Sequence, residues 1–70
     1  MQRWESPHRY YQAVIQRNLF GDWELLRIWG RKGSALGRQV MTQCESQADA
    51  DALLKRIAKV RARHGYVLLQ

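Results

Sequence analysis

The stretch WELLRIWGRKGSALGRQVMTQC, residues 23–44, contains two β-forming segments on either side of a glycine-rich reversal. Alternation over residues 23–29 places Trp, Leu, Arg and Trp on one face of a strand and Glu, Leu and Ile on the other. Because both faces carry apolar side chains, we predict a strand in the interior of a sheet. Residues 30–37 contain three glycines and favour a solvent-exposed hairpin loop. Residues 38–44 are therefore predicted to return as the neighbouring strand.

The segment before this hairpin adds one further strand and a turn. Residues 10–16, YYQAVIQ, are rich in aromatic and β-branched side chains, which favours a strand. Residues 18–22, NLFGD, supply the Asn, Gly and Asp that are typical of turns. Residues 1–8 are predicted to form a flexible N-terminal tail, with Pro7 disfavouring a helix just before it. The remainder, residues 9–70, is predicted to form a single domain.

A helix is predicted to begin after Ser46, because the segment SQAD resembles a capping box with Asp49 at the third helical position. Apolar residues recur with helical spacing and form one stripe, composed of Ala50, Leu53, Leu54, Ile57 and Val60. Acidic side chains near its start and basic side chains near its end complement the helix dipole. Gly65 is the expected left-handed stop. Residues 66–69, YVLL, are expected to form either an edge strand or a tail packed on the core.

These elements predict an α+β fold, a small antiparallel β-sheet of three to four strands with one α-helix packed across one face. Seventy residues suffice for one domain, and a hydrophobic content of 46% supports a compact core. The single cysteine, Cys44, has no partner for an internal disulfide, which suggests a reducing compartment. No signal-peptide pattern or long apolar stretch is present. We therefore expect a cytoplasmic protein without a membrane partner.

Charge gives the first indication of function. Twelve Lys and Arg residues stand against six Asp and Glu residues, for a net charge of +6. A positive field of this strength on so small a domain favours polyanions such as nucleic acid. The alternative is that the basic residues serve solubility alone.

Residues with catalytic or metal-binding chemistry are sparse. His8, His64 and Cys44 are the only soft ligands or nucleophile-type candidates, and none has a partner at metal-ligand spacing. No Ser-His-Asp arrangement or pair of facing carboxylates stands out. We predict a protein that is not an enzyme, with no catalytic residues, no metal, no cofactor and no small-molecule substrate.

A family resemblance rests on several features together. Trp29-Gly30-Arg31 closes the second predicted strand, and two further glycines follow in the reversal. Tyr10-Tyr11 opens the first strand, and the helix ends in RHGY at residues 63–66. Over residues 9–67 this pattern resembles the WGR domain, which is named for that tripeptide.

The resemblance implies an antiparallel sheet with a helix across it and a nucleic-acid-binding role. WGR domains occur in the regulatory region of DNA-dependent poly(ADP-ribose) polymerases, in bacterial proteins similar to a molybdate-metabolism regulator and as stand-alone chains. In the polymerases the motif Trp stacks on sugar near a broken DNA end, and polar and basic residues hold the backbone. This chain has neither zinc fingers nor a polymerase domain, and its reversal is slightly longer over residues 34–38.

By position, the resemblance implies that Trp29 stacks, that Arg31 is its charged partner, that Arg9 approaches the backbone and that Tyr66 is the aromatic residue after the helix. Lys32 and Arg38 cluster at the same turn, where side chains and exposed backbone N–H groups can bind phosphate. The predicted nucleic-acid-binding residues are Arg9, Trp29, Gly30, Arg31, Lys32, Arg38 and Tyr66. The expected partner is DNA, bound through phosphate and sugar with a preference for strand ends or nicks.

Structural and functional alternatives remain open from the sequence. Trp29 could fill the core at a strand end, and Arg31 could pair with Asp22 or Glu24. Five basic helix residues are interpreted first as a solvated face, namely Lys55, Arg56, Lys59, Arg61 and Arg63. The alternative function is a protein–protein interaction module that binds an acidic partner.

Overall fold

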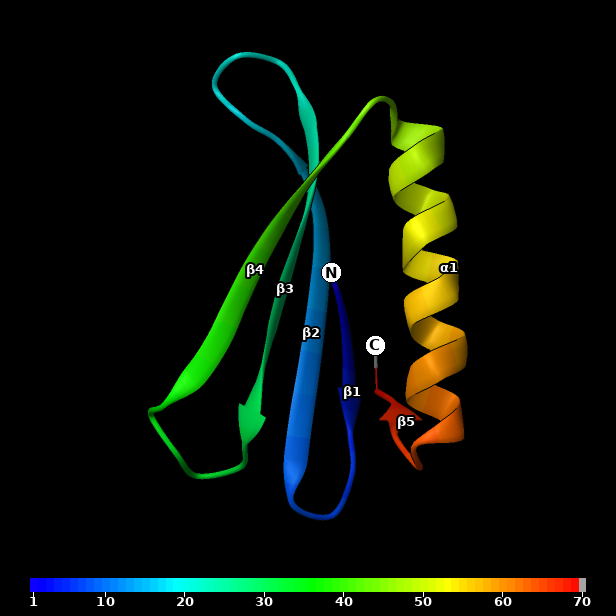
Figure 1. The fold of residues 1–70 in the computed structure, drawn as a ribbon. Helices are drawn as coiled ribbons and strands as arrows, with labels where there is room; N and C mark the ends of the chain where they lie inside the picture. Colours follow the sequence, from blue (N-terminus) through cyan, green and yellow to red (C-terminus); the bar gives the residue numbers. More distant parts are fainter. Residues whose placement is uncertain (70) are drawn as a thin grey trace.

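The computed structural model describes residues 1–69 and contains five strands and one helix (Figure 1). The elements in chain order are β1 (Gln2–Glu5), β2 (Arg9–Arg17), β3 (Trp23–Arg31), β4 (Gly37–Cys44), α1 (Gln47–Arg63) and β5 (Val67–Leu68). The strands form one sheet in the order β4-β3-β2-β1-β5, and every neighbouring pair is antiparallel. The predicted α+β fold is therefore confirmed, with β1 and β5 added beyond the three strands predicted from alternation.

The helix α1 packs across one face of the sheet and creates the core (Figure 1). The fully buried Leu25 lies on that face, together with Tyr11 and Ala13 of β2. Ile57, near the middle of the apolar stripe of α1, packs against them. Strand β3 has a neighbour on each side, as predicted, whereas β4 lies at one edge of the sheet and is exposed along residues 37–41. A trough lies between α1 and the sheet, and it is lined by residues of α1, β2 and β3.

The prediction of a tail over residues 1–8 is wrong for Gln2–Glu5, which form β1 between β2 and β5. Trp4 is only 2% exposed and contacts Tyr11 edge-on, with ring centres 5.9 Å apart. The segment QRWE carries one apolar residue among polar ones, so it shows no alternation. Its strand forms because Trp4 has a large apolar surface to bury against β2. Pro7 lies in the connection between β1 and β2.

The ends of α1 follow the sequence prediction. The Ser46 Oγ accepts a hydrogen bond of 3.2 Å from the backbone N–H of Asp49, as in an N-cap. Gly65 has φ +80°, and the N–H of Tyr66 donates to the carbonyl of Arg61 at 3.0 Å. This reversal brings Val67–Leu68 beside β1, which confirms the edge-strand alternative for the last segment.

Candidate nucleic-acid interface

The predicted binding residues meet where β3 ends and where β2 and β4 begin. Tyr11 and Arg9 lie opposite Trp29 and Arg31 in the β2–β3 register, and Trp29 lies opposite Arg38 of β4. Side chains two residues apart on a strand share a face, so these residues all point to the side of the sheet that α1 covers. One cavity is lined by Arg9, Trp29, Gly30, Arg31 and Tyr66. An adjoining cavity shares Trp29 and Gly30 and is completed by Leu36, Gly37 and Arg38.

Trp29 is held in place by Tyr11. The two rings are nearly parallel, with an angle of 12° and centres 5.6 Å apart. Trp29 is half-buried and packs against the core, while it also lines both cavities. The structural and the binding interpretations of Trp29 are therefore compatible, because Tyr11 supports the indole and part of it still faces solvent.

Two glycines allow β4 to begin close to Trp29. Gly30 and Gly37 lie opposite each other, and the ring of Tyr10 packs beside them on the face turned away from α1. A Cβ at Gly37 would lie 2.9 Å from the Tyr10 Oη and 3.1 Å from the backbone oxygen of Trp29. A Cβ at Gly30 would lie 3.2 Å from the carbonyl oxygen of Leu36. A larger residue at Gly37 would therefore displace backbone that borders the Trp29 cavity.

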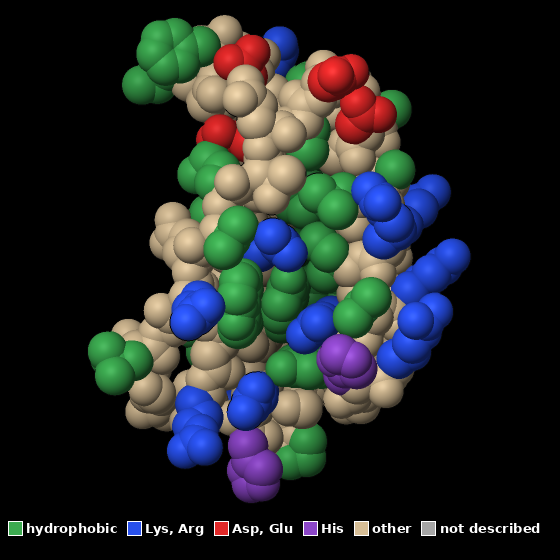
Figure 2. All heavy atoms as spheres, in the orientation of Figure 1, with side chains coloured by type: hydrophobic (Ala, Val, Ile, Leu, Met, Phe, Trp, Pro, Cys, Tyr) green, Lys and Arg blue, Asp and Glu red, His purple; other side chains and the backbone are tan. Residues whose placement is uncertain are grey.

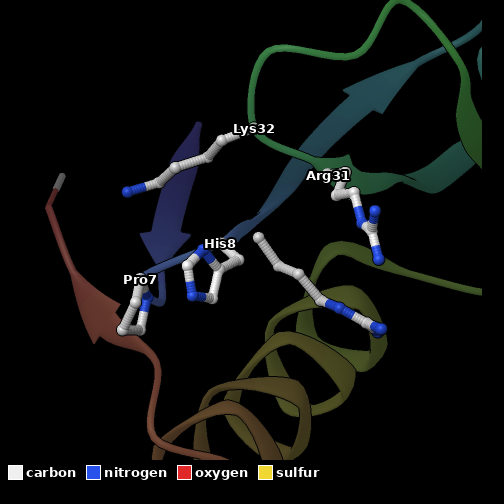
Figure 3. Close-up of a pocket in the computed structure, with 5 residues that line it drawn as sticks. Pro7, His8, Arg31 and Lys32 are labelled. Atoms are coloured by element: carbon white, nitrogen blue, oxygen red, sulfur yellow. The ribbon is translucent and has the colours of Figure 1, made fainter.

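Arg31 and Lys32 are neighbours in sequence, but their charged groups point to different sides (Figure 3). The Lys32 Nζ forms an ion pair with the Glu5 Oε1 at 2.8 Å, and the Arg3 Nε binds the other oxygen of Glu5 at 2.9 Å. These two hydrogen bonds, that of Lys32 first, lower the pKa of the Glu5 carboxyl below its usual value. The structure thus holds the Lys32 ammonium at a carboxylate, and Arg31 borders the cavity of Figure 3 from the other side.

Three exposed arginines remain around Trp29, and they are Arg9, Arg31 and Arg38. None of them forms an ion pair within residues 1–69, where Glu5 is the carboxylate that pairs with basic side chains. The alternative pairing of Arg31 with Asp22 or Glu24 is wrong. Those carboxylates lie at the opposite end of β3 and accept hydrogen bonds from glutamines instead.

Two further arginines at this surface were not predicted as binding residues. The Cζ of Arg61 lies 4.4 Å from the centre of the Tyr11 ring and 5.1 Å from that of Tyr66. The Cζ of Arg27 lies 5.9 Å from the centre of the Trp29 ring. Arg61 is half-buried, unlike the other four basic helix residues, which are exposed as expected. The available signals were the position of Arg27 two residues before Trp29 and that of Arg61 four residues after the buried Ile57.

Charge is separated along the molecule. In Figure 2 the acidic side chains gather at the top of the view, where α1 begins, and the basic ones lie over the lower half and along the helix. Hydrophobic side chains occupy the space between β4 and α1, next to basic ones (Figure 2). A polyanion is therefore attracted to the end of the molecule that carries Trp29.

Within residues 1–69, no group of three or more His, Cys, Asp or Glu side chains is placed to hold a metal ion. No helix in that range is long and apolar enough to cross a membrane.

Comparison with known proteins gives a family match over almost the whole chain. The family model described as "WGR domain" matches residues 2–70. The chain is also 38% identical over 58 residues to "Uncharacterized protein y4dW" of Sinorhizobium fredii (strain NBRC 101917 / NGR234). That alignment covers 83% of this chain and 28% of the relative, so the chain spans little more than a quarter of the relative's length. No solved structure gives a significant match. WGR domains are generally nucleic-acid-binding modules rather than catalytic domains.

Proposed function

Because this chain belongs to the WGR domain family, we propose that it binds DNA through the surface around Trp29, with a preference for strand ends and nicks. This surface, called the Trp29 surface below, consists of Arg9, Trp29, Gly30, Arg31, Arg38 and Tyr66. Arg9, Arg31 and Arg38 bind phosphates, and Trp29 contacts a sugar or base. Lys32 lies at the margin and serves chiefly to hold Glu5.

The observation that carries the proposal concerns the ion pairing of the three arginines around Trp29. Arg9, Arg31 and Arg38 are exposed and form no ion pair within the described residues, although they flank one half-buried indole. Guanidinium groups free of carboxylates bind phosphate oxygens with charge-assisted hydrogen bonds. Such contacts supply affinity with little sequence information, so we expect DNA binding that is weakly sequence-specific and strongly salt-dependent.

The preference for ends and nicks follows from the way Trp29 is held. Tyr11 stacks on one side of the indole, and the remaining surface of the ring is open to a ligand. In an intact duplex every base is stacked on both faces. At an end the last base presents an unstacked face, and at a nick the interrupted strand can open and present one. An aromatic ring can cover such a face for about 1–3 kcal/mol.

The test is a competition titration with nicked, blunt-ended and closed circular DNA at low salt. The variants are Trp29→Ala and Arg31→Met, each with a matched control of the same chemistry elsewhere. Phe20→Ala removes an aromatic ring that is 89% exposed in the β2–β3 turn, and Arg63→Met removes an exposed charge from α1. Circular dichroism establishes that every variant is folded.

We expect the wild type to prefer nicked over closed circular DNA, and Trp29→Ala to lose that preference while Phe20→Ala keeps it. Arg31→Met should weaken binding to all three forms more than Arg63→Met does. Equal binding of the wild type to all forms would contradict the end preference. No binding at low salt would contradict DNA as the partner. A complex with an acidic protein that survives nuclease treatment would then support the alternative function, a protein–protein interaction module.

A further inference from the structure

We propose that Arg27 and Arg61 form a second phosphate site, in the trough between β3 and α1, which holds a single-stranded extension leaving a DNA end. The proposal rests on the proposed function, since the strand is assumed to start at the Trp29 surface. Arg27 and Arg61 are called the inner arginine pair below.

The first observation concerns hydrogen bonding. The Nε atoms of Arg27 and Arg61 are buried, and neither makes a hydrogen bond within the described part of the chain. A buried donor without an acceptor costs about 1–3 kcal/mol, and more when it is charged. The rings of Tyr11 and Tyr66 favour the positive charge of Arg61, but they offer no lone pair in line with its Nε–H. Two such donors beside one cavity indicate a ligand that brings acceptor oxygens.

The second observation is the composition of that cavity. It has a volume of about 240 Å³ and is lined by three arginines, Arg27, Arg56 and Arg61, with no carboxylate among its lining residues. Its other walls are the Tyr11 ring and apolar side chains of α1, including Leu53 and Val60. Guanidinium groups suit a phosphate, and aromatic and apolar walls suit a sugar or a base. The combination fits a nucleotide unit better than an isolated inorganic anion.

The third observation is the order of residues along β3. Arg27, Trp29 and Arg31 share one face at alternate positions, so each step along the strand is about 6.6 Å. This is close to the distance that one nucleotide spans in an extended strand. Arg31 and Arg27 are two such steps apart, so a strand that crosses Trp29 with one phosphate near Arg31 reaches the inner arginine pair with the phosphate two nucleotides further along.

The trough selects for a single strand because its donors are recessed. Duplex DNA is stiff over about 150 base pairs and presents its phosphates on a convex surface, so it cannot follow the floor of the trough. A single strand is narrow and flexible enough to bring a phosphate to the guanidinium groups that line the cavity. We therefore expect ends with a single-stranded extension to bind more tightly than blunt ends.

The experiment compares a blunt duplex with the same duplex carrying a short thymidine extension. The variants Arg27→Met and Arg61→Met retain most of the side-chain length, and Arg63→Met removes the same charge from the exposed side of α1. We expect the wild type to bind the extended duplex about tenfold more tightly, as one charge-assisted contact supplies. Each inner variant should lose that gain and reduce the salt slope on the extended duplex by about 0.7, with a smaller loss of affinity for the blunt duplex.

A second measurement does not depend on the variants folding. The Nε–Hε NMR signals of Arg27 and Arg61 in the wild type should shift with the extended duplex and with a short oligothymidylate. They should not shift with the blunt duplex or with an oligoglutamate peptide.

Three outcomes would overturn the inner site. The first is that Arg63→Met loses as much of the affinity gained from the extension as Arg27→Met and Arg61→Met do. The second is equal affinity of the wild type for both duplexes, and the third is Nε–Hε signals that stay in place or respond equally to oligoglutamate. If only these occur, while Trp29 still responds to the blunt duplex, the inner site fails and the proposed function stands. If Trp29 responds to no DNA, the proposed function fails and the inner site fails with it.

Discussion

The neighbouring residues Arg31 and Lys32 provide a test of how the structure partitions charge. Both variants, Arg31→Met and Lys32→Met, remove one positive charge at adjacent positions. The structure predicts different results, because Lys32 is bound to Glu5 at 2.8 Å whereas Arg31 has no carboxylate partner within residues 1–69. Arg31→Met should therefore release one counterion fewer than the wild type when it binds DNA, whereas Lys32→Met should release as many as the wild type.

The expected salt dependence of binding follows from three phosphate contacts, those of Arg9, Arg31 and Arg38. Each contributes about 0.9 to the slope of log affinity against log salt, which gives about −2.7 on nicked duplex DNA. From about 50 to about 200 mM salt the wild type should lose about 40-fold in affinity. Arg31→Met should have a slope of about −1.8 and lose about 12-fold over the same range. Lys32→Met should keep the slope of the wild type.

The assay is fluorescence anisotropy with labelled nicked duplex over a series of salt concentrations, after circular dichroism has confirmed that both variants are folded. Loss of Lys32 leaves Glu5 paired with Arg3, so no free carboxylate is introduced near the surface. Equal reduction of the slope by the two substitutions would refute the reasoning. A slope near zero for the wild type would refute phosphate contacts altogether.

Three further predictions concern stability and are checked by urea or thermal unfolding followed by circular dichroism. Trp4→Ala should destabilise the domain by about 3–5 kcal/mol, which is a large share of the free energy of unfolding of roughly 3.5–10 kcal/mol expected for a domain of this length. A cost under about 1 kcal/mol would mean that β1 is dispensable for stability. Gly37→Ala should be destabilising because the new Cβ lies 2.9 Å from the Tyr10 Oη and 3.1 Å from the backbone oxygen of Trp29. Adding Tyr10→Phe should relieve part of this cost. An unchanged unfolding midpoint for Gly37→Ala would show that the close contact of β4 with Tyr10 and Trp29 does not require glycine. Glu5→Gln should be less stable than the wild type above pH 4.5, the usual pKa of that carboxyl, and the difference should shrink as the pH falls below it; a difference that is constant with pH would refute the ion pairs.

The sign of the pH effect follows from the direction of the pKa shift. Lys32, and then Arg3, lower the pKa of Glu5 in the folded protein. Such a group stabilises the folded state fully above its unfolded pKa, and the contribution is lost as the pH falls through the folded value. The stability of the wild type should therefore approach that of Glu5→Gln in acid and remain higher in base.

The parts of the fold that were predictable are those in which the local pattern and the tertiary environment agree. Alternation over residues 23–29, the glycines of the reversal and the Ser46 cap each specify an element without reference to distant residues. β1 was missed because its only strong signal, Trp4, acquires meaning through contact with Tyr11. The pairing of Lys32 with Glu5 was missed for the same reason, since it requires β1 to lie in the sheet.

The proximity of the residues of the Trp29 surface was predictable, because they come from strand ends that a hairpin brings together. The inner arginine pair was not. Hydrophobic periodicity counts Arg as a solvent-facing residue. The half-buried position of Arg61 depends on Tyr11 and Tyr66, which lie outside the helix and therefore outside its periodic pattern. The long apolar stem of Arg makes such burial feasible.

The most direct test of the central claim is a chemical-shift map of the wild type titrated with nicked duplex DNA. We expect the largest changes at Trp29, including its indole N–H, and at the neighbouring Gly30 and Arg38. The opposite face of the sheet, represented by Leu26 and Met41, should remain unchanged. Changes centred on that opposite face, or no changes at low salt, would contradict the assignment of the Trp29 surface as the DNA-binding site.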